Sequence, residues 1–302
     1  MGSGRWDKGS WDAYARSASS LSTRELYKSH SVQKQYDAKH VTLRESRDSA
    51  DNPLSTPIII GLDVTGSMGF IAEHIAKSGL GTTIQSVLDR KPVTDPHLLI
   101  MAIGDIIYDR APLQITQFEA DNRLVEQLTG LYLEGGGGSN SYESYDGAWL
   151  FASAMTSTDS YEKRGNKGYL FTIGDEDCPV EYNVKGYNEH LNKVFPEQVA
   201  KQLANVSAKQ ALADASEKYH VFHLIITQGN GCANKSTRDR NIANWRKSLG
   251  DAAIIVDNYK YVPEVISSVI QVNEGDDPEE VINSWQTVEA RATVRNALFP
   301  SK

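Results

Sequence analysis

Residues 57–70, PIIIGLDVTGSMGF, determine the predicted fold. The run Pro57–Asp63 is short, continuous and rich in β-branched residues, which is typical of a strand buried on both faces of a parallel sheet. A helix is expected next, weakened locally by Gly79 and Gly81, because apolar residues recur at near-helical spacing: Met68, Ile71, Ile75, Leu80, Ile84, Val87 and Leu88. The segment therefore predicts a buried strand followed directly by a helix.

The same alternation of strand and helix continues along the chain. Helical patterns separate further strand-like runs at 97–106, 113–119, 168–177, 219–227 and 251–258. Crossovers long enough for helices favour parallel strands covered on both faces. The predicted fold class is therefore α/β, with a doubly wound, mostly parallel six-stranded sheet and helices on both faces, as in Rossmann-like proteins.

Three parts of the chain are expected. Residues 1–54 are polar with scattered aromatics and are predicted to be an extension, a partly ordered arm that packs on the main body. Residues 55–275 form the domain, with a helix-prone insertion at about 178–218 that contains a capping box starting at Ser207. Residues 276–302 are expected to form one last helix, because Asp277 can cap it and a proline and two acidic residues follow.

The composition restricts the class of protein. The 302 residues are 40% hydrophobic and 23% charged, which is ordinary for a globular chain. No apolar run is long enough for a membrane span, and the N-terminus lacks a secretory signal, so we expect a cytoplasmic protein without a membrane partner. The net charge of −8 argues against nucleic acid as a partner. Cys178 and Cys232 show no metal-binding spacing and are expected to be free thiols.

Polar side chains gather where three predicted structural units end. Asp63, Thr65 and Ser67 follow the first strand at intervals of two residues, the glycine loop 135–144 precedes a helix, and Asp175 ends another strand. Ligands of open parallel sheets bind at the carboxyl ends of the strands, so these groups are expected at one edge. Carboxylates and hydroxyls are hard oxygen donors that suit Mg²⁺. The sequence thus predicts a magnesium site.

These motifs together resemble the von Willebrand factor A (vWA) domain with its metal-ion-dependent adhesion site, of the bacterial or phage type, over about residues 55–275. The resemblance implies one short antiparallel edge strand at 113–119. It also implies a Mg²⁺ or Mn²⁺ ion whose open position accepts an acidic side chain of a protein partner. Asp63, Thr65 and Ser67 match the first motif, and Asp175 matches the carboxylate after the fourth strand.

The glycine loop departs from the family's usual pattern. Where a threonine is common, this chain has GGGGSNSYES, which is closer to a Gly-Gly-x-Asp-x-x-Glu variant found in some relatives. That variant would place Asn140 at the metal and Glu143 just behind it. Ser139 and Ser141 remain alternatives, with Ser141 expected near the partner or behind the ligands.

Simpler structural explanations exist for several of these residues. Thr65 or Ser67 can cap a helix, and Asp175 can be a solvated loop acid. Asp105, at the end of the second strand, either borders the site or begins a turn. His220 and His223 are three residues apart on a predicted strand, so they face opposite sides and are interpreted as structural.

The leading functional hypothesis is a non-enzymatic, Mg²⁺-dependent protein-binding module or adaptor. Because bacterial relatives of the family often work beside AAA-type ATPases, such an ATPase is an expected partner. One alternative is an assembly protein in which the domain is a scaffold and the N-terminal arm wraps a neighbour. Another is a Mg²⁺-dependent phosphohydrolase with Asp63 as nucleophile, although the second aspartate expected two residues later is replaced by Thr65.

Overall fold

The structure is a computed structural model of the 302-residue chain. It describes residues 29–136, 142–181 and 187–300, together with six single residues of the N-terminal segment: Gly9, Ala13, Arg16, Ser22, Glu25 and Tyr27.

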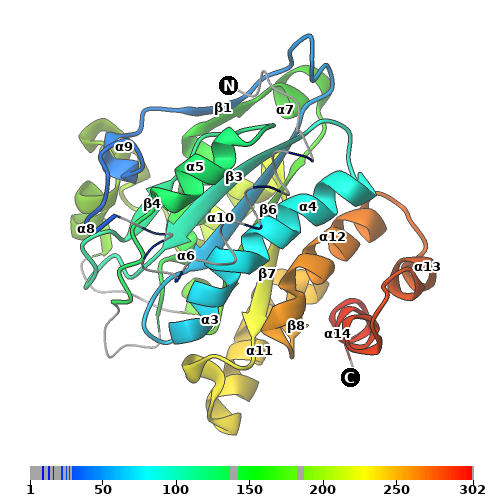
Figure 1. Cartoon of the computed structure of the whole chain (residues 1–302). Coiled ribbons are helices and arrows are strands. Elements are labelled where there is room, and N and C mark those ends of the chain that lie inside the picture. Colours follow the sequence, from blue (N-terminus) through cyan, green and yellow to red (C-terminus); the bar gives the residue numbers. More distant parts are fainter. Residues whose placement is uncertain are drawn as a thin grey trace.

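A six-stranded sheet forms the centre of the molecule, with the strand order β4-β3-β2-β6-β7-β8 (Figure 1). All neighbouring strands are parallel except β4, which is antiparallel to β3. The predicted fold class and the predicted antiparallel edge strand are therefore confirmed, although β4 is shorter than the run 113–119. The bounds are β2 Thr56–Asp63, β3 Pro96–Ile103, β4 Leu113–Ile115, β6 Gly168–Gly174, β7 Tyr219–Ile226 and β8 Ala253–Val256.

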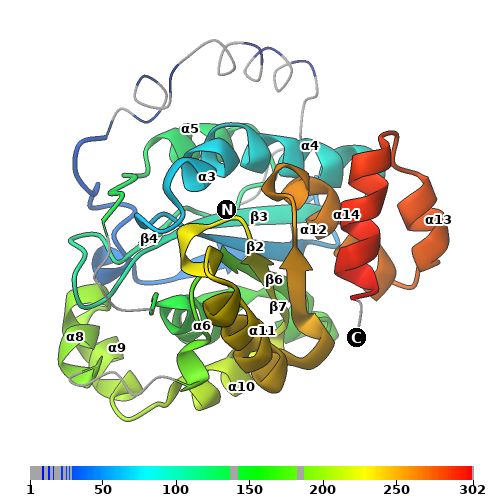
Figure 2. The ribbon, with the colours of Figure 1, turned by 90° about the horizontal axis from the view of Figure 1, so that it is seen from below.

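Helices cover both faces of this sheet, as Figure 2 shows from below. One buried apolar cluster joins the sheet to α3 Gly69–His74, α4 Leu80–Arg90, α5 Arg123–Thr129, α12 Val262–Asn273, α13 Pro278–Asn283 and α14 Val288–Leu298. A second cluster on the other face includes residues of α6 Tyr145–Ala154, α8 Tyr187–Val194, α9 Glu197–Leu203, α10 Ala208–Lys218 and α11 Lys235–Leu249. The strands need apolar residues on both sides because both faces are buried, which explains the continuous apolar run in β2.

The strand order changes direction between β2 and β6. From β2 the chain proceeds to β3 and β4 on one side, and then returns to add β6, β7 and β8 on the other. Such a switch point leaves a crevice at the carboxyl ends of the two central strands, where ligands of open α/β sheets bind. Asp63 is the last residue of β2, and Asp175 directly follows β6.

The helix after β2 is interrupted. Between α3 and α4 lies a π-helical turn, η2 Ile75–Gly79, close to the glycines that were expected to weaken the helix. A π-turn changes the pairing of backbone carbonyls along the helix. The hydroxyl of Tyr27, from the N-terminal segment, donates a hydrogen bond to the carbonyl oxygen of Ala76 at 2.7 Å. The N-terminal segment therefore contacts the helix that begins beside the predicted metal site.

The described part of the N-terminal segment packs on the domain. Its strand β1 (Arg44–Ser46) pairs in parallel with β5 (Thr156–Thr158) in a separate two-stranded sheet. Tyr27 and Tyr36 are buried in the main apolar cluster. The guanidinium of Arg44 also donates hydrogen bonds to the carbonyl oxygens of Gln35 and Ile115. The division of the chain at residue 54 stays a prediction.

The C-terminal segment differs from the sequence expectation. Asp277 caps a helix as predicted and accepts a hydrogen bond from the Glu280 N–H at 2.9 Å, but that helix, α13, ends at Asn283. A second cap, Thr287, begins α14. The turn between them lets the Trp285 ring pack beneath the guanidinium of Arg90, with 3.3 Å between the guanidinium carbon and the ring centroid. The prediction of one helix was therefore wrong, because this packing separates two helices.

The helix-prone insertion forms α8, α9 and α10 together with a 3-10 turn, η3 Pro179–Glu181. Ser207 caps α10 as predicted, accepting a hydrogen bond from the Gln210 N–H at 3.2 Å. A further helix, α7 Asp159–Arg164, follows β5. The candidate site is built from the turns that follow β2, β6 and β7.

Candidate metal site

Asp63 stands at the carboxyl end of β2 with both side-chain oxygens engaged. Its Oδ1 accepts hydrogen bonds from the Thr65 N–H at 2.9 Å and from the Thr65 hydroxyl at 2.6 Å. Its Oδ2 accepts a hydrogen bond from the Tyr145 hydroxyl at 2.7 Å. Asp63 is fully buried, and these three hydrogen bonds fix the position and the orientation of its carboxylate.

The polar chain continues from Thr65 to the neighbouring strand. The Thr65 and Ser67 hydroxyl oxygens are 3.2 Å apart, and the Ser67 hydroxyl donates a hydrogen bond to Asp175 Oδ1 at 2.8 Å. Asp175 Oδ2 accepts a hydrogen bond from the Gly231 N–H at 2.7 Å, in the 3-10 turn η4 (Asn230–Cys232) after β7. The four side chains predicted from two strand ends are thus brought together in one continuous set of oxygens.

The helix-cap explanation is not seen for Thr65 and Ser67. Helix α3 begins after Met68, and no side chain accepts a hydrogen bond at its first turn. Asp175 is fully buried, so it is not a solvated loop acid. Both simpler explanations of these residues are therefore contradicted by their contacts.

Two glycines allow the carboxylates to approach the backbone this closely. A Cβ at Gly174 would lie 1.9 Å from the Tyr145 hydroxyl oxygen and 2.9 Å from Asp63 Oδ2. A Cβ at Gly229 would lie 2.3 Å from Asp175 Oδ2. Real Cβ atoms do not come this near to another heavy atom, so the site requires glycine at both positions.

The glycine loop is only partly described. The Gly66 N–H donates a hydrogen bond to the carbonyl oxygen of Gly136 at 2.6 Å, which brings the start of the loop against the Asp63 turn. Asn140 and Ser141, like Ser139, lie outside the described residues. The assignment of Asn140 to the metal therefore stays a prediction.

Glu143, which follows this loop, is buried close to the oxygen set. It is 3% exposed, and its Oε2 has no hydrogen-bond partner among the residues that the structure describes. Burial, and then the charge of Asp63, raise the pKa of Glu143 to about 11. A carboxyl with this pKa holds its proton at neutral pH, which suits a position behind the metal ligands.

Asp105 fits both of its sequence interpretations. Its Oδ1 accepts a hydrogen bond from the Ile107 N–H at 2.7 Å, so it begins the turn after β3. Its charge also contributes to the raised pKa of Glu143, so it borders the same group of carboxylates. It contacts neither Asp63 nor Asp175 through a described hydrogen bond.

Negative charge is concentrated in this buried crevice. Burial and the nearby Asp175 raise the pKa of Asp63 to about 7, and burial raises the pKa of Asp175. Burial and the charges of Asp175 and Asp63 raise the pKa of Glu176 to about 8. Arg240 offsets part of this last effect and lies beside Asp177, with Nε 3.2 Å from Oδ2. Buried carboxylates of one sign are costly to ionise together unless a proton or a cation compensates them.

The aromatic residues that hold Asp63 in place were not identified from the sequence. Tyr145 donates to Asp63, and its ring packs edge-on against His223 and Trp245, at centroid distances of 4.9 and 5.5 Å. His223 and Trp245 stack face to face at 3.5 Å. Nothing in the local sequence places Tyr145 opposite Asp63, because the contact joins residues 82 positions apart.

The contribution of the turn after β7 was also missed, although its signal was present. The sequence TQGNGC follows the strand run 219–227 directly, and glycines at a strand end can expose backbone N–H groups. Cys232 and Asn241 hold the Asp175 backbone, since both donate hydrogen bonds to its carbonyl oxygen, at 3.2 and 3.1 Å.

His220, His223, Cys178 and Cys232 lie among structural neighbours. His223 is buried and its Nδ1 lies 2.8 Å from the Thr172 hydroxyl, whereas His220 is partly exposed beside Tyr169. The two rings therefore take separate neighbours. Cys178 and Cys232 are both buried and are not in a disulfide.

The donor chemistry fits a divalent cation with an oxygen shell. In the described part of the chain, no group of three or more His, Cys, Asp or Glu side chains is arranged to hold a metal ion. The oxygen set differs from such a group because it combines two carboxylates, Asp63 and Asp175, with two hydroxyls, Thr65 and Ser67. Mg²⁺ commonly keeps several waters and takes few carboxylates directly, so this mixed set suits it. The concentration of buried carboxylates in the crevice also favours a cation there.

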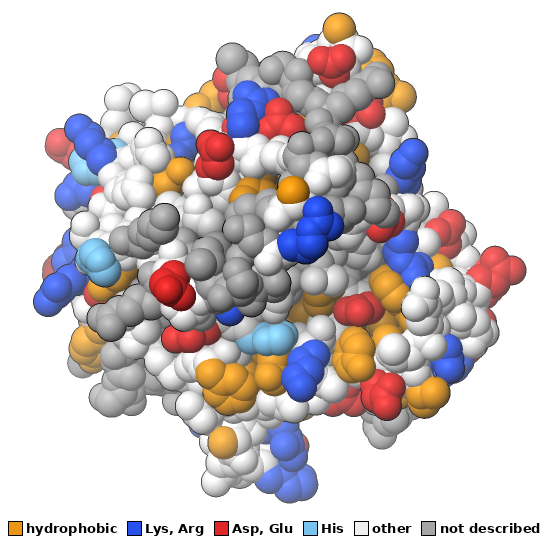
Figure 3. Space-filling view, viewed as in Figure 1, with side chains coloured by type: hydrophobic (Ala, Val, Ile, Leu, Met, Phe, Trp, Pro, Cys, Tyr) orange, Lys and Arg blue, Asp and Glu red, His pale blue; other side chains and the backbone are white. Residues whose placement is uncertain are grey.

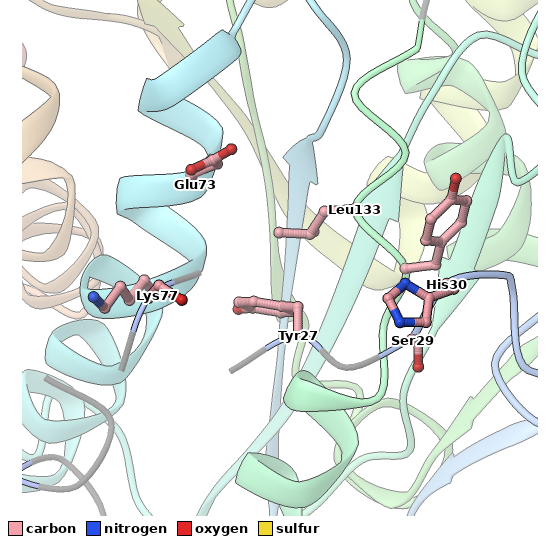
Figure 4. Close-up of a pocket in the computed structure, with 8 residues that line it drawn as sticks. Tyr27, Ser29, His30, Glu73, Lys77 and Leu133 are labelled. Carbon is pink, nitrogen blue, oxygen red and sulfur yellow. The ribbon is translucent and has the colours of Figure 1, made fainter. Parts of the chain in front are cut away.

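A separate hollow of about 620 Å³ lies between the N-terminal segment and the helix that carries Glu73 and Lys77 (Figure 4). Tyr27 and Leu133 lie in the middle of this view, between that helix and His30. None of the oxygen donors of the candidate metal site lines this hollow. Among the described residues that line it, the charged side chains are Glu73 and Lys77, which differ from the oxygen donors of the strand-end crevice.

No helix among the described residues is both long enough and apolar enough to cross a membrane.

Comparisons with known proteins give only distant similarities. No family model matches the chain, and no curated protein is similar enough to match. The pilus adhesin SpaC of Lactobacillus rhamnosus GG matches 79% of this chain and 32% of its own at 11% identity, with a TM-score of 0.45. Its open conformation covers 80% of this chain and 31% of its own at 11% identity, with a TM-score of 0.46. A von Willebrand factor type A structure from Catenulispora acidiphila matches 82% of this chain and 49% of its own at 14% identity, with a TM-score of 0.39.

The chain thus spans about a third to a half of the length of these structures. With TM-scores below 0.5, these similarities support no conclusion about function. The fold assignment rests on the strand order and register of the sheet.

Proposed function

We propose that this chain is a non-enzymatic, Mg²⁺-dependent protein-binding module with a metal-ion-dependent adhesion site of the vWA type. One observation carries the proposal: Asp63, Thr65, Ser67 and Asp175 form a continuous set of oxygens at the switch point between β2 and β6. In the proposal a carboxylate of the partner supplies a further oxygen to the bound ion.

The bound Mg²⁺ or Mn²⁺ would supply a Lewis-acidic centre with a position open to the partner. Asp63 and Asp175 provide the negative charge that attracts the ion, and the Thr65 and Ser67 hydroxyls complete this side of the shell. Asn140 is proposed as a further ligand. Ser141, Glu143 and Asp105 are proposed to lie behind the ligands or beside the partner. Because the ion would have only a small number of charged ligands, it would stay electrophilic, and this favours binding of an acidic side chain of the partner.

The sequence beside Asp63 favours binding over phosphoryl transfer. The second aspartate that a phosphoryl-transfer site would carry two residues after the nucleophile is replaced by Thr65, whose hydroxyl donates a hydrogen bond to Asp63. The assembly alternative needs an arm that reaches a neighbour, and the described part of residues 29–54 packs on its own domain. We therefore rank both alternatives below the adhesion site.

Calorimetry with Mg²⁺ and Mn²⁺ tests the proposal. Asp63→Ala and Ser67→Ala should each weaken the affinity for the metal at least tenfold, because each removes an oxygen from the set. Asp251→Asn, which changes an exposed acid in η5 (Gly250–Ala252), is the matched control and should leave the affinity unchanged. Wild-type affinity in Asp63→Ala would show that the oxygen set does not bind the ion.

The partner and the compartment extend this proposal. We propose a cytoplasmic adaptor, and an AAA-type ATPase is the first partner to test. Binding of such an ATPase should require Mg²⁺ and should be lost in Asp63→Ala but not in Asp251→Asn.

A further inference from the structure

An exposed aromatic surface lies beside the candidate metal site. Phe70, the second residue of α3, is 69% exposed. Its ring contacts Tyr259 edge-on with centroids 5.9 Å apart, and Tyr259 contacts His74 in the same manner at 5.1 Å. We call these three residues the aromatic shelf. Figure 3 shows hydrophobic and histidine side chains together on the lower part of the face where α3 lies.

The shelf has a fixed position relative to the metal site. Phe70 comes three residues after Ser67, so their Cα atoms are at most about 10 Å apart. The Ser67 carbonyl oxygen accepts a hydrogen bond from the Asn230 N–H at 3.0 Å. The Tyr259 N–H donates to Gln228 Oε1 at 2.9 Å, in the same turn after β7. This turn therefore connects the loop of the metal site to the shelf.

The composition of the shelf is that of a binding surface. Among the described residues, Phe70 is the most exposed of the large hydrophobic side chains, and it lies at the edge where the oxygen set lies. Aromatic side chains provide much contact area at a low cost in conformational entropy and are enriched among the residues that dominate interface energies. Lys260 follows Tyr259 and is exposed, so positive charge borders the shelf. Glu73, next to His74 on α3, is exposed as well, so both signs of charge border the shelf and its apolar contact area is its distinguishing property.

We propose that the aromatic shelf binds an apolar side chain of the same partner segment that supplies the acidic group to the metal. This inference rests on the proposed function and specifies its partner. An extended chain advances about 3.3 Å per residue, so a separation of at most about 10 Å corresponds to at most three residues. The partner motif is then an Asp or Glu with a Leu or Phe one to three positions away.

Synthetic octapeptides on an array provide the test. Each peptide carries one Asp in a Gly/Ser background, with Leu placed one to five positions from the Asp or absent. In Mg²⁺ the labelled protein should bind at least one of the peptides with Leu one to three positions away at least tenfold more tightly than the Leu-free peptide, and Leu four or five positions away should give no such advantage. Chelation with EDTA should abolish binding of all of them.

Two variants separate the shelf from the metal. Phe70→Ser should remove the advantage of Leu while leaving the Mg²⁺ affinity, measured by calorimetry, unchanged. Val288→Ser is the matched control, since Val288 is 68% exposed on α14, and it should change neither quantity.

The possible outcomes distinguish this inference from the proposed function. If Leu gives no advantage, or if Phe70→Ser retains it, the shelf has no role in recognition although the metal site stands. Binding of Leu peptides that persists in EDTA would also contradict the combined motif. If the wild-type protein shows no Mg²⁺ affinity, the proposed function itself is wrong.

Discussion

Replacing Asp63 by asparagine should stabilise the metal-free protein and abolish its response to Mg²⁺. Burial and the charge of Asp175 raise the pKa of Asp63 from 3.8 to about 7, so the ionised carboxylate is unfavourable in the folded state. The pKa of Asp63 is higher in the folded than in the unfolded protein. Ionisation of Asp63 therefore costs no stability below pH 3.8, and the free energy of unfolding falls as the pH rises from 3.8 to about 7. A shift of roughly 3 units corresponds to about 4 kcal/mol above pH 7.

The asparagine side chain recovers only part of this energy. Its oxygen can still accept both hydrogen bonds from Thr65, but its amide group then faces the Tyr145 hydroxyl, which must rotate to accept instead of donate. This rearrangement costs about 1 kcal/mol, the net value of a typical hydrogen bond. Asp63→Asn should therefore be more stable than the wild type by about 2 to 3 kcal/mol at pH 8 in EDTA, and close to equal at pH 4.

Urea denaturation at pH 8 and pH 4, with EDTA or with saturating Mg²⁺, measures these differences. Mg²⁺ at 100 times its dissociation constant should stabilise the wild type at pH 8 by about 2.7 kcal/mol and should leave the variant unchanged. The conservative variant Asp63→Glu keeps the charge and controls for its removal. If Asp63→Asn is destabilised equally at both pH values, the carboxylate is not under electrostatic strain and the reasoning fails.

Three further substitutions test single contacts. Gly174→Ala would place a Cβ 1.9 Å from the Tyr145 hydroxyl oxygen. It should therefore destabilise the fold by about 1 to 3 kcal/mol, the usual cost of overpacking, and weaken Mg²⁺ binding. Wild-type metal affinity in calorimetry would contradict this. Tyr145→Phe removes the donor to Asp63 Oδ2, so thermal denaturation in EDTA should show a loss of about 1 kcal/mol, with Mg²⁺ affinity changed less than tenfold. Tyr27→Phe removes the hydrogen bond to the Ala76 carbonyl and should cost about 1 kcal/mol in urea denaturation; no change would mean that water replaces the hydroxyl.

The parts of the site that could be predicted are those fixed by strand ends. Asp63, Thr65 and Ser67 are adjacent in sequence, and the rule that parallel strands end at one edge places Asp175 beside them. The strand order confirms this placement because β2 and β6 are neighbours. Local sequence and one topological rule are therefore enough for this half of the site.

The supporting residues depend on tertiary register, which local sequence does not contain. The hydroxyl of Tyr145 reaches Asp63 only because α6 packs at one particular height against the sheet. Strands β1 and β5 have three residues each, too few to show a periodic pattern. The break between α13 and α14 follows from the packing of Trp285 against Arg90.

The pairing of β1 with β5 also affects the order of events during synthesis. Arg44 pairs with Thr156, so the N-terminal segment leaves the ribosome more than a hundred residues before its partner strand exists. Contacts at this sequence separation form late, because closing a long loop costs entropy before any contact repays it. Tyr27 and Tyr36 contact residues that are synthesised earlier than Thr156: the Tyr27 hydroxyl donates to the Ala76 carbonyl, and the Tyr36 carbonyl accepts from the Ile115 N–H. One stretch of chain is thus attached in two stages, its aromatic side chains to partners that emerge early and its strand to a partner that emerges late.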